Sequence, residues 1–198
     1  METAHVTQPR RRSYTLWIVI GVIILLGLWI MTTYNGLVGS RAGVDASWSQ
    51  VETQYQRRFD LVPNLVNTVK GAADFEQSTL QAVTEARTKW MGAAGNRDNQ
   101  IAAAGEFDSA LSRLLVTVEA YPQLQATQAF RDLMTQIEGT ENRIATARRD
   151  YNESVRGYNV AVRTFPRNLV AGMLGFAPEE FFDAAEGSDT APTVDFSE

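Results

Sequence analysis

The sequence predicts an all-α protein, with an N-terminal transmembrane helix followed by an antiparallel bundle of four long helices. Three observations support this fold class. An uncharged apolar run lies close to the N-terminus, and apolar residues recur at spacings of three and four through most of the remaining chain. No segment shows the sustained apolar–polar alternation of a half-buried strand. The 198 residues are enough for one modest domain with appendages.

The first element is the transmembrane helix, assigned to residues 14–34. No charged residue occurs from Ser13 to Ser40, and Leu16–Met31 is wholly apolar apart from its two glycines. This apolar run rises about 24 Å as a helix, and its uncharged flanks extend it to the roughly 30 Å of a bilayer core. Aromatic side chains near the two ends are expected at the membrane interface. They are Tyr14, Trp17, Trp29 and Tyr34.

Positive charge sets the expected direction of this helix. Residues 1–13 contain three consecutive arginines, Arg10–Arg12, whereas only Arg41 closely follows the span. The positive-inside rule therefore places this short basic N-terminus in the cytoplasm and the body of the chain outside the cytoplasmic membrane. The alternative is a cleaved signal peptide, with Val38-Gly39-Ser40 as its small-residue cleavage site.

Residues 40–166 are expected to form the helical bundle. Four apolar stripes with helical spacing run from Val44 to Val69, Leu80 to Trp90, Ile101 to Val118 and Phe130 to Phe165. Lys70-Gly71 is expected to end the first helix, and Asp74 to begin the second. Tyr121-Pro122 and Pro166 are expected to end the third and fourth helices.

Two features of the first helix affect its course. Three glycines, Gly36, Gly39 and Gly43, lie just beyond the span and predict either a continuous helix or a soft joint. Pro63 lies inside the apolar stripe and removes a backbone donor, so we predict a kink between Phe59 and Pro63.

Helix lengths predict how the bundle is arranged. The first and fourth helices are long enough to form an antiparallel pair, with the two shorter helices packed along its distal part. If Arg41 is level with Phe165, the register places Trp48 beside Tyr158 and Tyr55 beside Tyr151. We interpret these aromatic pairs as layers of the core, in the manner of a coiled coil.

Composition excludes several kinds of chemistry. The chain has no cysteine and one histidine, His5, which excludes a disulfide framework, a thiol nucleophile and the common histidine-based triads and metal sites within one chain. We therefore assign no catalytic residue, no cofactor and no metal. Basic and acidic residues balance between Arg41 and Pro178, so no concentrated positive field is available for nucleic acid.

Six polar residues on the first and fourth helices form the candidate interaction patch. They are Arg57, Arg58, Asn64, Asn67, Arg148 and Arg149. The four arginines fall at a similar height in the predicted register, where they would bind an anionic ligand or a partner, or else form a belt of ion pairs between helices. Asn64 and Asn67 lie beside Pro63, where their amides would satisfy the carbonyl that the proline frees, or form a polar notch for a partner.

Several stretches resemble the LemA family. The clearest are Gln56–Gly71 (QRRFDLVPNLVNTVKG), Glu138–Ala145 (EGTENRIA) and the Tyr-Asn pairs that begin at Tyr151 and Tyr158. The resemblance extends from about residue 34 to residue 176. It implies a single-span protein of the bacterial inner membrane with a bundle of long helices and no catalytic residues. Members of the family have been connected with the organisation of the envelope and of internal membranes, including magnetosome formation.

We therefore expect a membrane-anchored scaffold or protein-interaction module of the bacterial envelope, with the lipid bilayer and another envelope protein as its partners. An extracytoplasmic ligand sensor that acts through a membrane partner is the alternative. Gly21 and Gly27 lack the small-xxx-small spacing, so nothing in the span indicates an oligomeric state.

Two segments follow the bundle. Residues 167–182 form a juxtamembrane apolar segment, expected either to rest on the outer leaflet or to fold back on the base of the bundle. Residues 183–198 are expected to be an acidic disordered tail, because no basic residue follows Pro178.

Overall fold

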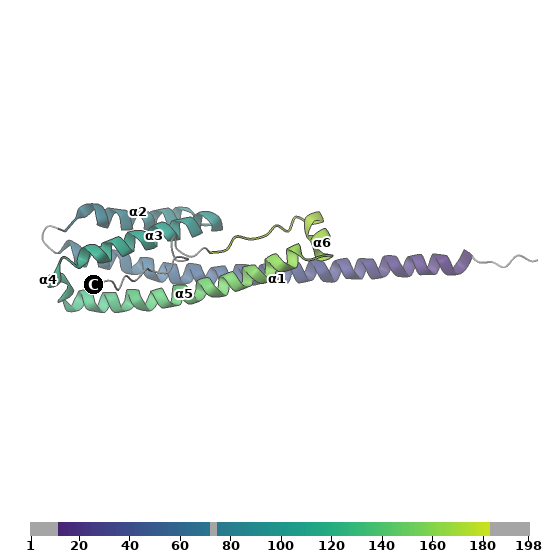
Figure 1. Cartoon of the computed structure of the whole chain (residues 1–198), viewed down its shortest axis with the longest axis horizontal. Helices are drawn as coiled ribbons and strands as arrows, with labels where there is room; N and C mark the ends of the chain where they lie inside the picture. Colours follow the sequence, from purple (N-terminus) through teal and green to yellow (C-terminus); the bar gives the residue numbers. More distant parts are fainter. Residues whose placement is uncertain (1–11, 72–74, 183–198) are drawn as a thin grey trace, which may run out of the picture. The chain divides into compact units, whose positions relative to one another are not determined.

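The computed structural model describes residues 12–71 and 75–182, and for Arg12 and Ser13 it describes the backbone alone. These ranges contain helices and no strand, so the predicted all-α class is confirmed (Figure 1). The helices are α1 (Arg12–Lys70), α2 (Gln77–Gly92), α3 (Arg97–Val118), α4 (Pro122–Gln125), α5 (Gln128–Arg163) and α6 (Arg167–Met173). The predicted tail at 183–198 and the predicted helix start at Asp74 lie outside the described residues.

The chain divides into two compact units. The first comprises the residues up to Ala42 together with Gly157–Pro178, and the second comprises Gly43–Arg156 together with the residues from Glu179 onward. Both α1 and α5 contribute residues to each unit.

Helix α1 is a single helix of 59 residues. It continues through the three glycines that follow the apolar run, so the continuous helix is the correct alternative there. It also continues through Pro63, and the kink at that residue stays a prediction. Among the described residues, α1 is the one helix long and apolar enough to cross a membrane. Nearly all large side chains of Leu16–Met31 are exposed, as a lipid-facing segment requires.

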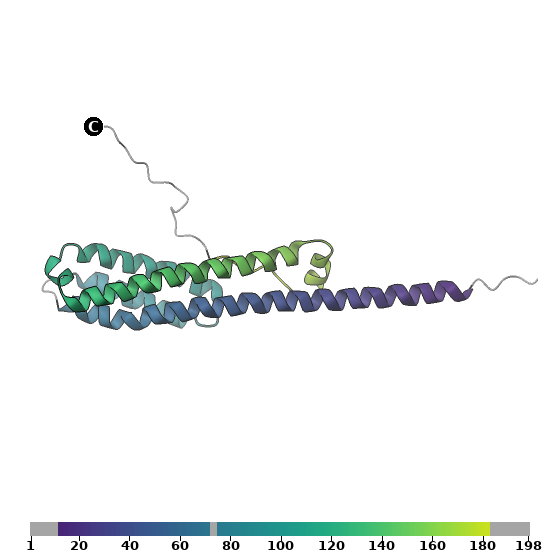
Figure 2. The ribbon, with the colours of Figure 1, turned by 90° about the horizontal axis from the view of Figure 1, so that it is seen from below.

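Helices α2 and α3 form an antiparallel hairpin within the second unit (Figures 1 and 2). Gly95 adopts a left-handed conformation in the connecting turn, with φ of 86°, which glycine tolerates at no steric cost. Asn96 caps the following helix, because its side-chain oxygen accepts a hydrogen bond from the Asn99 amide at 3.0 Å. This turn folds α3 back along α2.

Two short helices were not predicted. Helix α4 begins at Pro122, where proline suits the first helical position, and α6 follows Pro166. The fourth long helix, α5, accordingly begins at Gln128 and ends at Arg163.

The core of the second unit contains the predicted apolar stripe of α1, with Val44, Trp48, Val51, Tyr55 and Phe59 all buried. The predicted register is wrong by one heptad. The ring of Trp48 packs against Tyr151 of α5 with centroids 5.2 Å apart, and Arg58 pairs with Glu141 in the same alignment. The predicted register left out the connections between helices, whereas α4 and its flanking turns occupy nine residues between α3 and α5.

Candidate functional site

A polar network lies inside the second unit, centred on Arg58 of α1. This side chain is 1% exposed, and its Nη1 donates to Oδ1 of Asp108 on α3 at 2.9 Å. Its Nε donates to the Thr140 hydroxyl of α5 at 3.3 Å, and its other terminal nitrogen pairs with Glu141. Burying an uncompensated guanidinium costs several kcal/mol, so these partners on two other helices are what allow Arg58 to lie in the interior.

Arg148 of α5 approaches the same carboxylate from the other side. It pairs with Oδ2 of Asp108 and donates to the hydroxyl of Tyr55, which itself donates to Oδ2 at 3.1 Å. Asp108 therefore joins α1, α3 and α5 through two arginines and a tyrosine. Sequence reasoning placed Arg58 and Arg148 at a similar height but missed Asp108. The available signal was its place beside Phe107 on the apolar stripe of α3, where a charged residue needs partners.

Burial sets the electrostatics of this network. It raises the pKa of Asp108 to about 7, an effect that nearby Glu141 reinforces and Arg58 opposes. Burial also lowers the pKa of Arg148 to about 10. The charge of the network therefore changes near neutral pH through Asp108.

A second feature is the aromatic cluster that receives Phe182. The Phe182 side chain is 5% exposed and stacks with Trp48 and Tyr55, each at a centroid distance of 6.3 Å. The guanidinium of Arg148 lies 4.2 Å from the centre of the Phe182 ring. Phe182 therefore extends the aromatic core and also covers the polar network.

Hydrogen bonds to the main chain hold this segment in place. The Asn152 amide donates to the Phe182 carbonyl at 2.8 Å and accepts from the Phe182 N–H at 2.7 Å. The hydroxyl of Tyr151 donates to the Glu180 carbonyl at 2.8 Å. The first Tyr-Asn pair, Tyr151 and Asn152, thus binds an extended segment. For residues 179–182 the folded-back alternative is the correct one.

Arg97 of α3 forms a further contact with this segment. It pairs with Glu179 at 2.8 Å and with Asp45 of α1 at 2.7 Å. Its guanidinium also lies over the rings of Trp48 and Tyr151, at 5.5 and 5.8 Å from their centres. Stacked, paired arginines of this kind restrain neighbouring segments well, because the planar group is geometrically specific.

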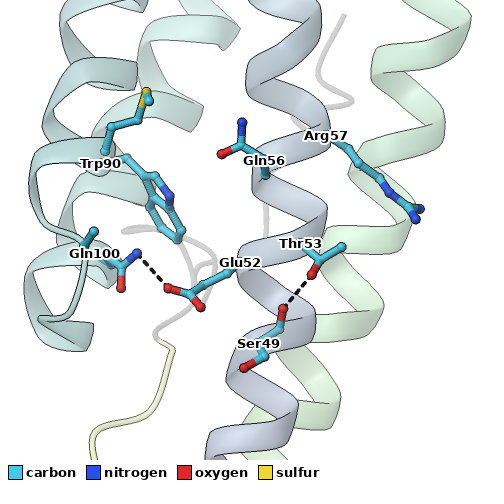
Figure 3. Close-up of a pocket in the computed structure, with 9 residues that line it drawn as sticks. Ser49, Glu52, Thr53, Gln56, Arg57, Trp90 and Gln100 are labelled. Atoms are coloured by element: carbon cyan, nitrogen blue, oxygen red, sulfur yellow. Dashed lines mark hydrogen bonds between the residues drawn. The ribbon is translucent and has the colours of Figure 1, made fainter.

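A pocket of about 620 Å³ opens on the surface of the second unit (Figure 3). Trp90, Met91 and Gln100 line one side of it, and residues of α1 from Ser49 to Arg57 line the other. Gln100 donates to Glu52 across the pocket at 3.0 Å. Its lining combines the edge of buried Trp90 with amide, carboxylate and guanidinium groups, a combination suited to a small polar ligand or to a side chain of a partner.

The structure separates the six residues of the candidate interaction patch. Arg58 is enclosed and Arg148 is half-buried, and the two are brought together by Asp108. The other four are exposed, and their side chains form no hydrogen bond or ion pair within residues 12–71 and 75–182. They are Arg57, Asn64, Asn67 and Arg149. The predicted amide bonds beside Pro63 are therefore not formed in this part of the chain.

The aromatic residues expected at the membrane interface lie in the first unit. Tyr14, Trp17 and Tyr34 are exposed, and Trp29 is partly covered. Tyr34 also contacts Phe176 edge to face, with centroids 5.9 Å apart.

The polar network and the aromatic cluster are suited to holding the helices of the second unit together. Both carboxylate oxygens of Asp108 already accept hydrogen bonds from protein donors. No group of three or more metal-ligating side chains occurs among the described residues. The network and the aromatic cluster accordingly fix three helices and one extended segment to one another.

Fold and site together define the class as a helical-bundle protein whose first helix carries a candidate membrane span. The chain belongs to the LemA family, whose model matches residues 47–196. Magnetosome proteins MamQ 1 and MamQ 2 of Paramagnetospirillum magneticum are each 29% identical over 197 residues, covering 87% of this chain and 72% of the relative. Protein LemA of Metamycoplasma hominis is 25% identical over 152 residues, covering 77% of this chain and 69% of the relative.

Proposed function

We propose that this protein is a single-pass, membrane-anchored scaffold that presents a helical interaction surface in the bacterial envelope and performs no catalysis. The continuity of α1 carries the proposal. One helix of 59 residues contains both the apolar run and a wall of the bundle, with no break between them. The chain therefore passes from the membrane segment into the bundle through a continuous helix and not through a loop. The relatives named as magnetosome proteins support a role at a bacterial membrane.

The interaction surface that we propose is a polar stripe on α1. Arg57, Asp60, Asn64 and Asn67 recur at spacings of three and four, which places them on one side of the helix, and all four are exposed. Arg57 also lines the pocket beside Trp90. Unused guanidinium and amide donors on a rigid helix suit recognition of carboxylates and backbone carbonyls on a partner protein.

Orientation follows from the arginines that precede the span. We place the N-terminus in the cytoplasm and the bundle outside the inner membrane, by the positive-inside rule. The chain lacks cysteine, so one introduced at Asn64 is a unique label. A membrane-impermeant maleimide should label it in intact spheroplasts as fully as in lysed ones. Labelling only after lysis would show that the bundle lies in the cytoplasm, the opposite of the proposed orientation.

The decisive experiment is photo-crosslinking in cells from a probe at Asn64. We expect capture of one reproducible envelope protein, and Arg57→Glu should reduce this capture because it reverses charge on the same stripe. The matched control is Arg113→Glu, which reverses an exposed arginine on α3. Equal capture in the two variants, or capture that is unaffected by Arg57→Glu, would refute the proposed surface.

The pocket supports a second candidate function, that of a ligand sensor acting through a membrane partner. The size of the pocket and its Trp90 wall fit a small polar molecule. This function predicts a small molecule that co-purifies with the protein and is lost on Trp90→Ala, in the absence of any crosslinked protein from Asn64.

A further inference from the structure

Helix α6 has one apolar side exposed and one buried. Phe165, just before the helix, is 74% exposed and Met173 is 84% exposed, while Leu169 and Leu174 are each at least half exposed. Val170 and Ala171 are buried on the opposite side. Leu169 and Met173 are four residues apart within α6, so their exposed side chains lie on the same side of the helix.

Contacts within the first unit fix the level of this segment along α1. Gly175 adopts a left-handed conformation, with φ of 75°, and the Phe176 N–H then donates to the Ala171 carbonyl at 2.9 Å. This reversal brings the Phe176 ring against Tyr34. The Tyr158 hydroxyl holds the next residue, because it donates to the Ala177 carbonyl at 2.9 Å.

Tyr34 lies at the end of the candidate span. It is three residues beyond Met31, the last residue of the apolar run, which is about 4.5 Å along a helix. The next charged residue of α1 is Arg41, about 15 Å beyond Met31. The segment of α1 that receives Phe176 is therefore uncharged, and Tyr34 lies within the roughly 5–8 Å of one interfacial layer beyond the apolar run.

We propose that Phe165–Phe176 is a membrane-interface foot that binds the lipid surface next to the span, with its exposed apolar side chains at the boundary between headgroups and acyl chains. This inference rests on the proposed membrane anchor. Arg163 and Arg167, both exposed, lie on either side of Phe165 in the sequence and suit anionic headgroups. A seven-residue helix binds lipid weakly alone, but the covalent link to the span keeps it at high local concentration beside the bilayer.

Site-specific fluorescence tests this foot in the full chain. Single cysteines at Met173, Leu25 and Val116 would each carry an environment-sensitive nitrobenzoxadiazole probe in vesicles of phosphatidylethanolamine and phosphatidylglycerol. Quenchers are lipids with a spin label at carbon 5 or carbon 12 of the acyl chain. Val116 is the matched control, an apolar residue that is 66% exposed on α3 in the second unit.

We expect the carbon-5 label to quench the Met173 probe at least twofold more than the Val116 probe. The Leu25 probe should be quenched best by the carbon-12 label, which reports the anchor independently. Quenching of Leu25 with none at Met173 would overturn the foot and leave the anchor intact. Absence of quenching at both Met173 and Leu25 would overturn the foot and the anchor together. A Met173 signal that responds to protein dilution, and not to the labelled lipids, would assign this side to a second copy of the chain.

Discussion

Substitution of Asp108 by alanine tests the polar network most directly. The change removes the carboxylate that pairs with Arg58 and Arg148 and accepts from Tyr55. Arg58 then keeps its bonds to Glu141 and Thr140, whereas Arg148 keeps the Tyr55 hydroxyl and its contact with the Phe182 ring but no carboxylate among these partners. Removing one partner of a buried ion pair costs about 3–5 kcal/mol, because the remaining charge stays desolvated.

We expect the lower end of that range, about 3 kcal/mol, at pH 7. Asp108 has a pKa of about 7, so its carboxyl group is neutral for part of the time at this pH and part of the ion-pair attraction is already absent. The same helix supplies the control. Glu106 pairs with Lys89 at 2.5 Å, but both side chains are well exposed. Glu106→Ala should therefore leave stability nearly unchanged, since water compensates each exposed charge.

The assay is urea unfolding of the full chain in lipid nanodiscs, followed by tryptophan fluorescence. Trp90 stacks on Tyr55 with centroids 4.5 Å apart, which places this reporter next to the network. Equal unfolding midpoints for Asp108→Ala and Glu106→Ala would refute the reasoning, because the buried pair would then contribute no more than the exposed one.

Three further predictions follow. The pKa of Asp108 is raised above its ordinary value of 3.8, so the folded state binds more protons than the unfolded state between pH 4 and 7. The free energy of unfolding of the wild type, relative to that of Asp108→Asn, should therefore fall from pH 4 to 7 and level off above pH 7. A relative rise over this range in urea titrations would contradict the prediction. Asn152→Ala should remove both hydrogen bonds to the Phe182 backbone, at a cost of about 1–3 kcal/mol in stability. Amide hydrogen exchange at residues 179–182 should then be faster, and unchanged exchange would contradict the role given to Asn152. Gly95→Ala should lower stability by about 1 kcal/mol, since φ is 86°, and an unchanged urea midpoint would show that the turn accepts alanine.

The network has a consequence for how the bundle holds together. Arg58 and Arg148 come from the two longest helices, and both meet a residue of the shorter α3. The ring of Phe182 also packs against the guanidinium of Arg148. Loss of Asp108 or of Phe182 should therefore loosen the attachment of α3 and of residues 179–182 before it disrupts the packing of α1 against α5.

The sequence by itself determined the helical class, the candidate span and most helix ends. These are properties of local spacing and of single residues, such as Lys70 at the end of α1 and Pro122 just after the end of α3. It also placed Arg58 and Arg148 at a similar height, but by a register that is wrong by one heptad, and in the structure the two arginines meet through Asp108.

Only the tertiary structure decided the register and the composition of the site. Asp108 is fifty residues from Arg58, and Phe182 is thirty from Asn152, so no local pattern links either pair. The register depended on the residues that α4 and the turns occupy, and it determined that Tyr151, not Tyr158, meets Trp48. Spacing within a helix is fixed by its hydrogen bonds, whereas alignment between helices is fixed by side-chain packing, which exists only after the chain has folded.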